Sequence, residues 1–268
     1  MRLGFVAVLI LALAVPATAA VPRYSVKIIK TFPHDPQAFT EGLFYDRGHL
    51  YESTGRNGTS SIREVDLDSG KVLKSADIDE HFFGEGIVPW NGRIVSLTWR
   101  SGIGFVWNQN DLRVQKSFTY TGEGWGMTHD ARNLIMSDGT PALKFLDPDS
   151  LNVVRTLNVS YDGQPVMRVN ELEWVDGNIL ANIWMTHIVV RIDPASGKVN
   201  GVVDLDALPE VAAPPADQDA VPNGIAFDPD GHRLFVTGKL WPHLYQVELV
   251  PEAAPQTVKP RARHGKRH

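Results

Sequence analysis

The stretch Thr40-Glu41-Gly42-Leu43-Phe44 is followed by a short turn and the apolar segment His49-Leu50-Tyr51, and this arrangement occurs five times in the chain. The four later copies begin with Gly84-Glu85-Gly86, Gly124-Trp125-Gly126, Val169-Asn170-Glu171 and Pro222-Asn223-Gly224. From the second residue of each copy to that of the next, the steps are 44, 40, 45 and 53 residues. Repeats of this length, each with several short apolar segments, are typical of a β-propeller.

A second repeated element predicts where the outer strands of each sheet turn. An apolar residue, an Asp-centred turn and a further apolar run occupy residues 65–72, 146–150 and 192–199, and more loosely residues 106–111. Asp, Pro, Ser and Gly are the residues that tight turns prefer. We therefore predict an all-β fold, a five-bladed β-propeller with four-stranded antiparallel blades. The last blade needs one strand from residues 24–32, because the chain ends one strand early at residues 245–249.

The two ends of the chain have compositions unlike the repeats. Residues 1–20 combine Arg2, an apolar run and the small residues Ala17-Thr18-Ala19-Ala20, which is the pattern of a secretory signal peptide; an uncleaved anchor is the alternative. Residues 251–268 are rich in Pro and Ala and then basic, which predicts a disordered basic tail. The propeller domain is thus expected at residues 21–250 of an exported protein, periplasmic or secreted.

Charge and cysteine content narrow the classes of function. The whole chain has a net charge of −5, but residues 20–250 carry 20 basic and 30 acidic residues, a net charge of −10. An acidic domain argues against nucleic acid as a partner and suits a cationic ligand such as a peptide amino terminus. The chain has no Cys, so thiolate metal sites and catalytic thiols are excluded. We expect no metal, no cofactor, no membrane contact after signal cleavage, and a monomer.

The second residue of each repeat is a candidate site residue. A propeller binds its ligand at the mouth of the central channel, so equivalent positions of all blades meet there. Those positions hold Glu41, Glu85, Trp125, Asn170 and Asn223. Trp99, Trp184 and Lys239 follow the partner strands of the same repeats. Each also has a structural interpretation, in which the carboxylates bind backbone amides, the indoles fill the space between blades and the lysine forms an ion pair.

Several motifs appear in the order found in one known family. They are residues 32–43 (FPHDPQAFTEGL), 83–87 (FGEGI), 97–99 (LTW), 122–126 (GEGWG), 170–174 (NELEW), 221–226 (VPNGIA) and 236–239 (VTGK). Over nearly the whole predicted domain the sequence resembles the plant and bacterial type of glutaminyl-peptide cyclotransferase. That family is a five-bladed propeller that converts the N-terminal glutamine of peptides and proteins to pyroglutamate, releases ammonia, and needs no metal.

The resemblance implies a role for each candidate residue. Glu85 matches the family's acid/base glutamate, Asn170 and Lys239 match polar pocket positions, and the aromatic pocket corresponds to Phe39, Phe83, Trp99, Trp125 and Trp184. Glu41 stands where the plant enzymes carry glutamine, which places a second carboxylate near the first. Two close carboxylates tend to share one proton. This difference from the plant enzymes therefore leaves open how many protons the two carboxyl groups hold.

Two other functions remain open at this point. A propeller of this composition is also compatible with a non-catalytic protein that binds peptides or extracellular polymers, or with a metal-dependent lactonase or hydrolase. Ammonia release from a peptide that begins with glutamine, measured with and without a chelator, distinguishes the three.

Overall fold

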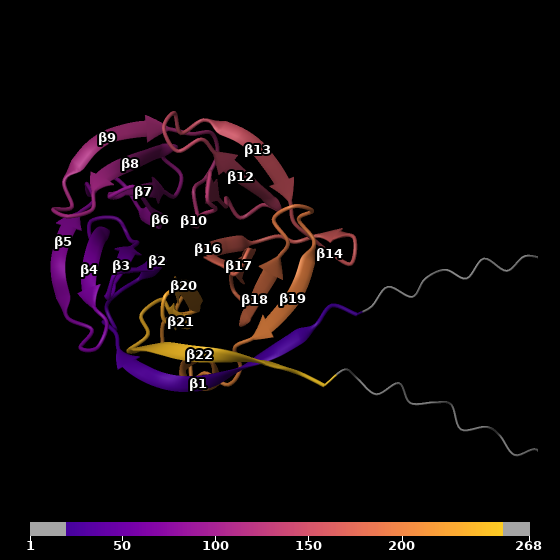
Figure 1. The fold of residues 1–268 in the computed structure, drawn as a ribbon. Helices are drawn as coiled ribbons and strands as arrows, with labels where there is room; N and C mark the ends of the chain where they lie inside the picture. The colour runs from indigo at the N-terminus through magenta and orange to yellow at the C-terminus, as the bar shows by residue number, and fades with distance from the viewer. Residues whose placement is uncertain (1–19, 254–268) are drawn as a thin grey trace, which may run out of the picture.

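The repeats of the sequence become the blades of a ring, shown along its axis in Figure 1. The structure, a computed structural model, describes residues 20–253. Blade one consists of β2 (Thr40–Asp46), β3 (His49–Thr54), β4 (Ser61–Asp66) and β5 (Val72–Asp77). Blade two consists of β6 (Gly84–Trp90), β7 (Arg93–Thr98), β8 (Ile103–Asn108) and β9 (Val114–Thr119). Blade three consists of β10 (Met127–His129), β11 (Leu134–Met136), β12 (Ala142–Leu146) and β13 (Val153–Asn158).

The remaining elements complete the ring. Blade four consists of β16 (Val169–Val175), β17 (Asn178–Ile183), β18 (Ile188–Ile192) and β19 (Val199–Asp204). Blade five combines β20 (Pro222–Asp228), β21 (Arg233–Gly238), β22 (His243–Pro251) and, from the other end of the chain, β1 (Arg23–Pro33). A small hairpin of β14 (Ser160–Tyr161) and β15 (Gln164–Pro165) precedes blade four, and the short helix α1 (Pro209–Ala212) precedes blade five. The predicted fold, an all-β propeller of five four-stranded antiparallel blades, is confirmed.

Blade five closes the ring with both ends of the described chain. β1 pairs antiparallel with β22 from Tyr24 opposite Pro251 to Pro33 opposite His243, as expected from the missing strand, and Figure 1 shows the two strands side by side. The backbone N–H of Glu252 donates to the Arg23 carbonyl at 2.9 Å. The paired segment thus includes Pro251, which the sequence assigned to the tail.

The predicted turns between the outer strands are also confirmed. Residues 66–72 connect β4 to β5, residues 108–114 connect β8 to β9, residues 146–153 connect β12 to β13, and residues 192–199 connect β18 to β19. Asp66 shows how the sequence specifies the turn, because its side-chain oxygen accepts the backbone N–H of Ser69 at 2.9 Å. Gly70 then adopts a φ angle of +67°, which glycine tolerates at little cost.

The glycine in the repeated motif is explained by the narrow centre of the ring. A Cβ atom at Gly86 would lie 2.5 Å from the carbonyl oxygen of Trp125, and one at Gly126 would lie 2.2 Å from that of Asn170. At these two positions the inner strands of neighbouring blades approach too closely for a side chain. In blade four the position holds Glu171 instead, and its carboxyl group contacts the inner strand of blade five.

Glu171 and Glu173 bridge the inner strands. Glu171 Oε2 accepts the backbone N–H of Ile225 at 2.9 Å, and Glu173 Oε1 accepts that of Phe227 at 2.8 Å. Inner strands present an open edge with unpaired N–H groups, and these carboxyl groups pair with two of them. Burial raises the pKa of Glu171 well above its usual value and that of Glu173 to about 8.

Two assignments from the sequence fall outside the described residues. The signal peptide at residues 1–20 lies outside them except for Ala20, and so does the tail from residue 254 onward. Within residues 20–253, no helix is long and apolar enough to cross a membrane.

Candidate active site

A cavity of about 190 Å³ opens at the end of the ring where the second strand of each blade ends. Its lining includes nine of the ten residues selected from the sequence, namely Phe39, Glu41, Phe83, Glu85, Trp99, Trp125, Asn170, Trp184 and Lys239. Arg56 and Asp219 complete the lining. Side chains from all five repeats thus meet at one point, as the propeller interpretation requires.

Irregular pairing in the inner strands directs the polar side chains into this cavity. The pairing of β2 with β3 shifts register between Thr40 and Gly42, and that of β6 with β7 shifts between Gly84 and Ile87. Glu41 and Glu85 lie within these two bulges, inside the inner strands β2 and β6. A bulge turns its extra residue away from the regular alternation of a strand. Asn170 and Asn223 occupy the equivalent shifts in β16 and β20.

Glu41 and Lys239 form a buried ion pair. Lys239 Nζ donates to Glu41 Oε1 at 2.6 Å, and their side chains are 6% and 2% exposed. Lys239 follows β21 in blade five and Glu41 lies in β2 of blade one, so the pair spans the point where the ring closes. Burial raises the pKa of Glu41, and the neighbouring Lys239 opposes that rise. The ion pair thus favours the ionised form of Glu41.

Glu85 is the carboxyl group of the pair whose surroundings favour the protonated form more strongly. Burial, together with the nearby negative charge of Glu41, raises the pKa of Glu85 well above its usual value. Two neighbouring carboxyl groups that are both buried tend to share one proton. Since Lys239 stabilises charge on Glu41, we expect that proton on Glu85. The second carboxylate, that of Glu41, therefore has a counterion in Lys239.

Aromatic rings from four blades surround this pair. The Phe39 and Phe83 ring centroids are 6.1 Å apart, those of Phe83 and Trp99 are 5.5 Å apart, and those of Trp125 and Trp184 are 5.6 Å apart. Such rings exclude water and hold a flexible substrate in a defined conformation. The cavity can therefore fold a side chain back on itself beside a carboxyl group that carries a proton.

Comparisons with known proteins agree with this geometry. Residues 4–249 match the family model of glutamine cyclotransferases. The chain belongs to the glutamine cyclotransferase family. It is 39% identical over 232 residues to the glutaminyl-peptide cyclotransferase of Arabidopsis thaliana, an alignment that covers 85% of this chain and 72% of the relative. The crystal structure of Myxococcus xanthus glutaminyl cyclase superposes with a TM-score of 0.82 at 39% identity, over 87% of this chain and 100% of that one.

Membership of the cyclotransferase family makes this protein an enzyme, and the resemblance found in the sequence is confirmed. Among residues 20–253, no group of three or more His, Asp or Glu side chains is arranged to hold a metal ion.

Asn223 was predicted from the sequence to bind substrate, but its side chain lies elsewhere. Its side chain is fully buried and does not line the cavity. Its amide nitrogen donates to the Thr40 carbonyl at 2.9 Å and to Glu41 Oε2 at 3.2 Å. The side chain therefore lies behind Glu41 and holds the second carboxylate oxygen, while Lys239 holds the first. Position in the repeat identified the residue, but the direction of its side chain makes it a positioning residue.

Asn170 lies where the sequence predicted, in the lining of the cavity. It is 3% exposed and lines the cavity. Its side-chain oxygen has no hydrogen-bond partner within residues 20–253. Because an unpaired buried polar atom is costly, this amide suits a polar group of a bound substrate.

Glu123 belongs to the quoted motif Gly122-Glu-Gly-Trp-Gly126, but no role was predicted for it from the sequence. Its Oε2 atom accepts the indole N–H of Trp99 at 2.8 Å and that of Trp125 at 2.9 Å. Its Oε1 atom accepts from Arg100 Nε at 3.1 Å. One carboxylate therefore fixes two walls of the cavity. A carboxylate two residues before a predicted pocket Trp was the signal available in the sequence.

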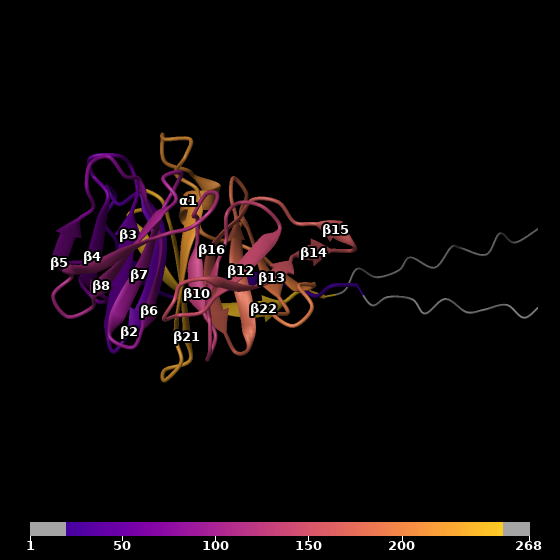
Figure 2. The same ribbon diagram turned by 90° about the horizontal axis from the view of Figure 1, so that it is seen from above.

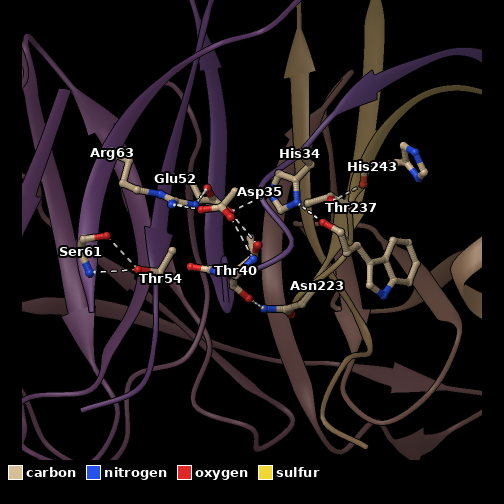
Figure 3. A network of polar contacts seen from close by, with 12 residues as sticks. His34, Asp35, Thr40, Glu52, Thr54, Ser61, Arg63, Asn223, Thr237 and His243 are labelled. Atoms are coloured by element: carbon tan, nitrogen blue, oxygen red, sulfur yellow. Dashed lines mark hydrogen bonds and ion pairs between the residues drawn. The ribbon is translucent and has the colours of Figure 1, made fainter. Parts of the chain in front are cut away.

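A polar network supports the strand that carries Glu41, and Figure 3 shows its members. The Thr40 hydroxyl donates to Glu52 Oε1 at 2.6 Å, His34 Nε2 lies 3.0 Å from the same oxygen, and Arg63 pairs with the other oxygen. Burial alone would raise the pKa of Glu52, but His34 and Arg63 lower it to about 2. The ionised Glu52 in β3 thus ties together β2, β4 and His34, which directly follows β1, next to the site.

Thr40→Val is expected to lower the free energy of unfolding by about 2 kcal/mol at pH 7, because it removes a hydrogen bond to a buried charge. The pKa of Glu52 is depressed on folding, so its contribution is complete above the unfolded value of 4.5 and declines as pH falls towards 2. The difference from wild type should therefore narrow below pH 4.5 in urea unfolding. Thr54→Val is the control, because that hydroxyl pairs only with the neutral Ser61; equal behaviour of the two variants would contradict the assignment.

Proposed function

We propose that this protein is a glutaminyl-peptide cyclotransferase that converts the N-terminal glutamine of peptides to pyroglutamate by general acid/base catalysis through Glu85. The observation that carries the proposal is the buried Glu85, whose pKa is raised, beside the Glu41–Lys239 ion pair in an aromatic cavity. A carboxyl group with a raised pKa suits proton transfer near neutral pH.

The reaction joins two groups of the same residue. The neutral α-amine nitrogen attacks the side-chain carboxamide carbon, and a C–N bond forms while the carbonyl oxygen takes up negative charge. Glu85 then gives its proton to the amide nitrogen, the original C–N bond breaks and ammonia leaves. The proton from the former amine passes to Glu85, which returns to its starting state. The free amine is available because an α-amino group has a pKa of about 7.7–8.0.

The remaining residues bind and orient in this proposal. The aromatic rings hold the glutamine side chain curled towards its own amine, which supplies much of the acceleration in an intramolecular reaction. The unpartnered Asn170 amide binds the substrate carboxamide. Lys239 keeps Glu41 ionised, so the carboxyl groups of Glu41 and Glu85 together hold one proton and not two. On this view the enzyme needs no metal, and residues 1–20 direct its export.

Purified enzyme with a dipeptide that begins with glutamine is expected to release ammonia, and to do so equally with and without a chelator. A coupled ammonia assay measures both rates. A dipeptide that begins with asparagine is the control, because it cannot close the same five-membered ring. Loss of ammonia release on chelation would favour a metal-dependent reaction, and a folded protein without release would favour a peptide-binding propeller.

A further inference from the structure

The loop between β3 and β4 carries an arginine with an unfavourable backbone conformation. Arg56 has a φ angle of +78°, in the left-handed region that non-glycine residues adopt at a cost. Its carbonyl oxygen accepts the backbone N–H of Thr59 at 3.1 Å and the Ser60 hydroxyl at 2.8 Å. The preceding Gly55 donates its N–H to the Phe39 carbonyl at 2.8 Å. These contacts hold the residue in the lining of the cavity.

Two contacts fix the guanidinium group of Arg56 at the cavity mouth. Its central carbon lies 4.3 Å from the Phe39 ring centroid, and Nη2 donates to Asp217 Oδ2 at 2.6 Å. Asp217 belongs to residues 205–221, the segment that lengthens the last repeat and contains α1, which Figure 2 shows at one end of the ring. The pair therefore joins blade one to this segment across the rim. Its side chains are 44% and 36% exposed, and so exposed an ion pair adds little stability. Stability does not account for the strained backbone.

The path of a bound peptide accounts better for the strained backbone of Arg56. The reacting atoms of the N-terminal glutamine must lie beside Glu85, which is 6% exposed, so the rest of the peptide leaves through the mouth. The charged lining residues at the mouth are Arg56 and Asp219, and of these Arg56 is the hydrogen-bond donor. A guanidinium group has five N–H donors, and Asp217 takes one of them through the hydrogen bond given above.

We infer that Arg56 binds the main-chain carbonyl oxygen that follows the N-terminal glutamine, and that Asp217 positions it. This inference rests on the proposed function. The carbonyl oxygen takes no part in the reaction, so the contact is equally strong in the ground state and in the transition state. Such uniform binding lowers KM and leaves kcat unchanged. A hydrogen bond from a charged group to this oxygen is expected to change KM by about tenfold or more.

The test compares two substrates that differ at the first peptide bond, with the concentration of each expressed as its neutral-amine form. One is a peptide that begins with glutamine, and the other has its first peptide bond replaced by an (E)-alkene of the same shape. Wild type should have a kcat/KM for the peptide about tenfold or more above that for the alkene. Arg56→Ala should lose this preference through a higher KM for the peptide, with kcat within about twofold. Asp217→Asn should lose part of it.

Arg47→Ala is the matched control. Arg47 also has a positive φ angle and pairs with a neighbouring carboxylate, that of Asp46, but it lies at the opposite end of β3 from Arg56. This variant should keep the wild-type preference. An equal loss on both substrates in Arg56→Ala, or an unchanged KM for the peptide, would overturn the inference while leaving the proposed function intact. Wild type that releases no ammonia from either substrate would overturn both.

Discussion

Glu85→Gln is expected to abolish turnover, with a loss of at least about 10³-fold in kcat, because glutamine cannot give a proton to the leaving nitrogen and regain it from the amine. The shape of the site should be kept. Glutamine is neutral like a protonated Glu85 and has nearly the same size and shape. Ammonia release with saturating peptide measures the loss, and thermal unfolding measures the integrity of the fold.

The direction in which Glu85→Gln changes the stability of the fold can also be predicted. The pKa of Glu85 is raised on folding, so the folded protein keeps a proton that the unfolded chain releases above pH 4.5, and this lowers stability as pH rises. Glutamine has no such penalty, so Tm at pH 8 should equal or exceed that of wild type. Full activity in a folded variant would remove Glu85 from the mechanism. A much lower Tm would instead give it a structural role.

The repeat predicted the ring and most of the site because equivalent positions of a propeller meet at its axis. Glu41, Glu85, Trp125 and Asn170 were found from their place in the repeat, without any knowledge of side-chain direction. That same reasoning misplaced Asn223, since a bulge directs its amide behind Glu41 and not into the cavity. Repetition fixes where the backbone lies, whereas the local register shift decides which way each side chain points.

Arg56 and Asp219 could not be found in this way. Both lie in connections between strands, Arg56 one residue beyond the position that Trp99, Trp184 and Lys239 occupy in other blades, and Asp219 in the long segment before β20. The ion pair between Glu41 and Lys239 was equally hidden, since the residues are far apart in the sequence and meet only because blade five closes against blade one. The sequence therefore predicted which side chains gather at the mouth of the cavity. Their charge state depends on contacts between blade five and blade one, which the sequence does not show.

Lys239→Met tests that charge state directly. It is expected to lower the free energy of unfolding at pH 7 by about 3–5 kcal/mol, because Glu41 would remain buried without its counterion. For a domain of this size, that loss corresponds to a fall in Tm of roughly 10 °C. Without Lys239 the pKa of Glu41 rises further, so the destabilisation should shrink as pH falls towards 4.5, where the unfolded chain also takes up the proton. Urea unfolding at pH 5 and pH 8 measures both effects.

The double variant Lys239→Met with Glu41→Gln provides the control. Removing both charges leaves neutral side chains of similar volume, and such replacements of buried ion pairs are often close to neutral in stability. The double variant should therefore regain most of the stability that Lys239→Met loses, with little difference between pH 5 and pH 8. If it were no more stable than Lys239→Met, the lysine would act through packing against Phe39, whose ring centroid lies 4.6 Å from Nζ, and not through the charge of Glu41. Recovery would instead mean that Lys239 keeps Glu41 ionised, so that the single proton of the pair stays on Glu85.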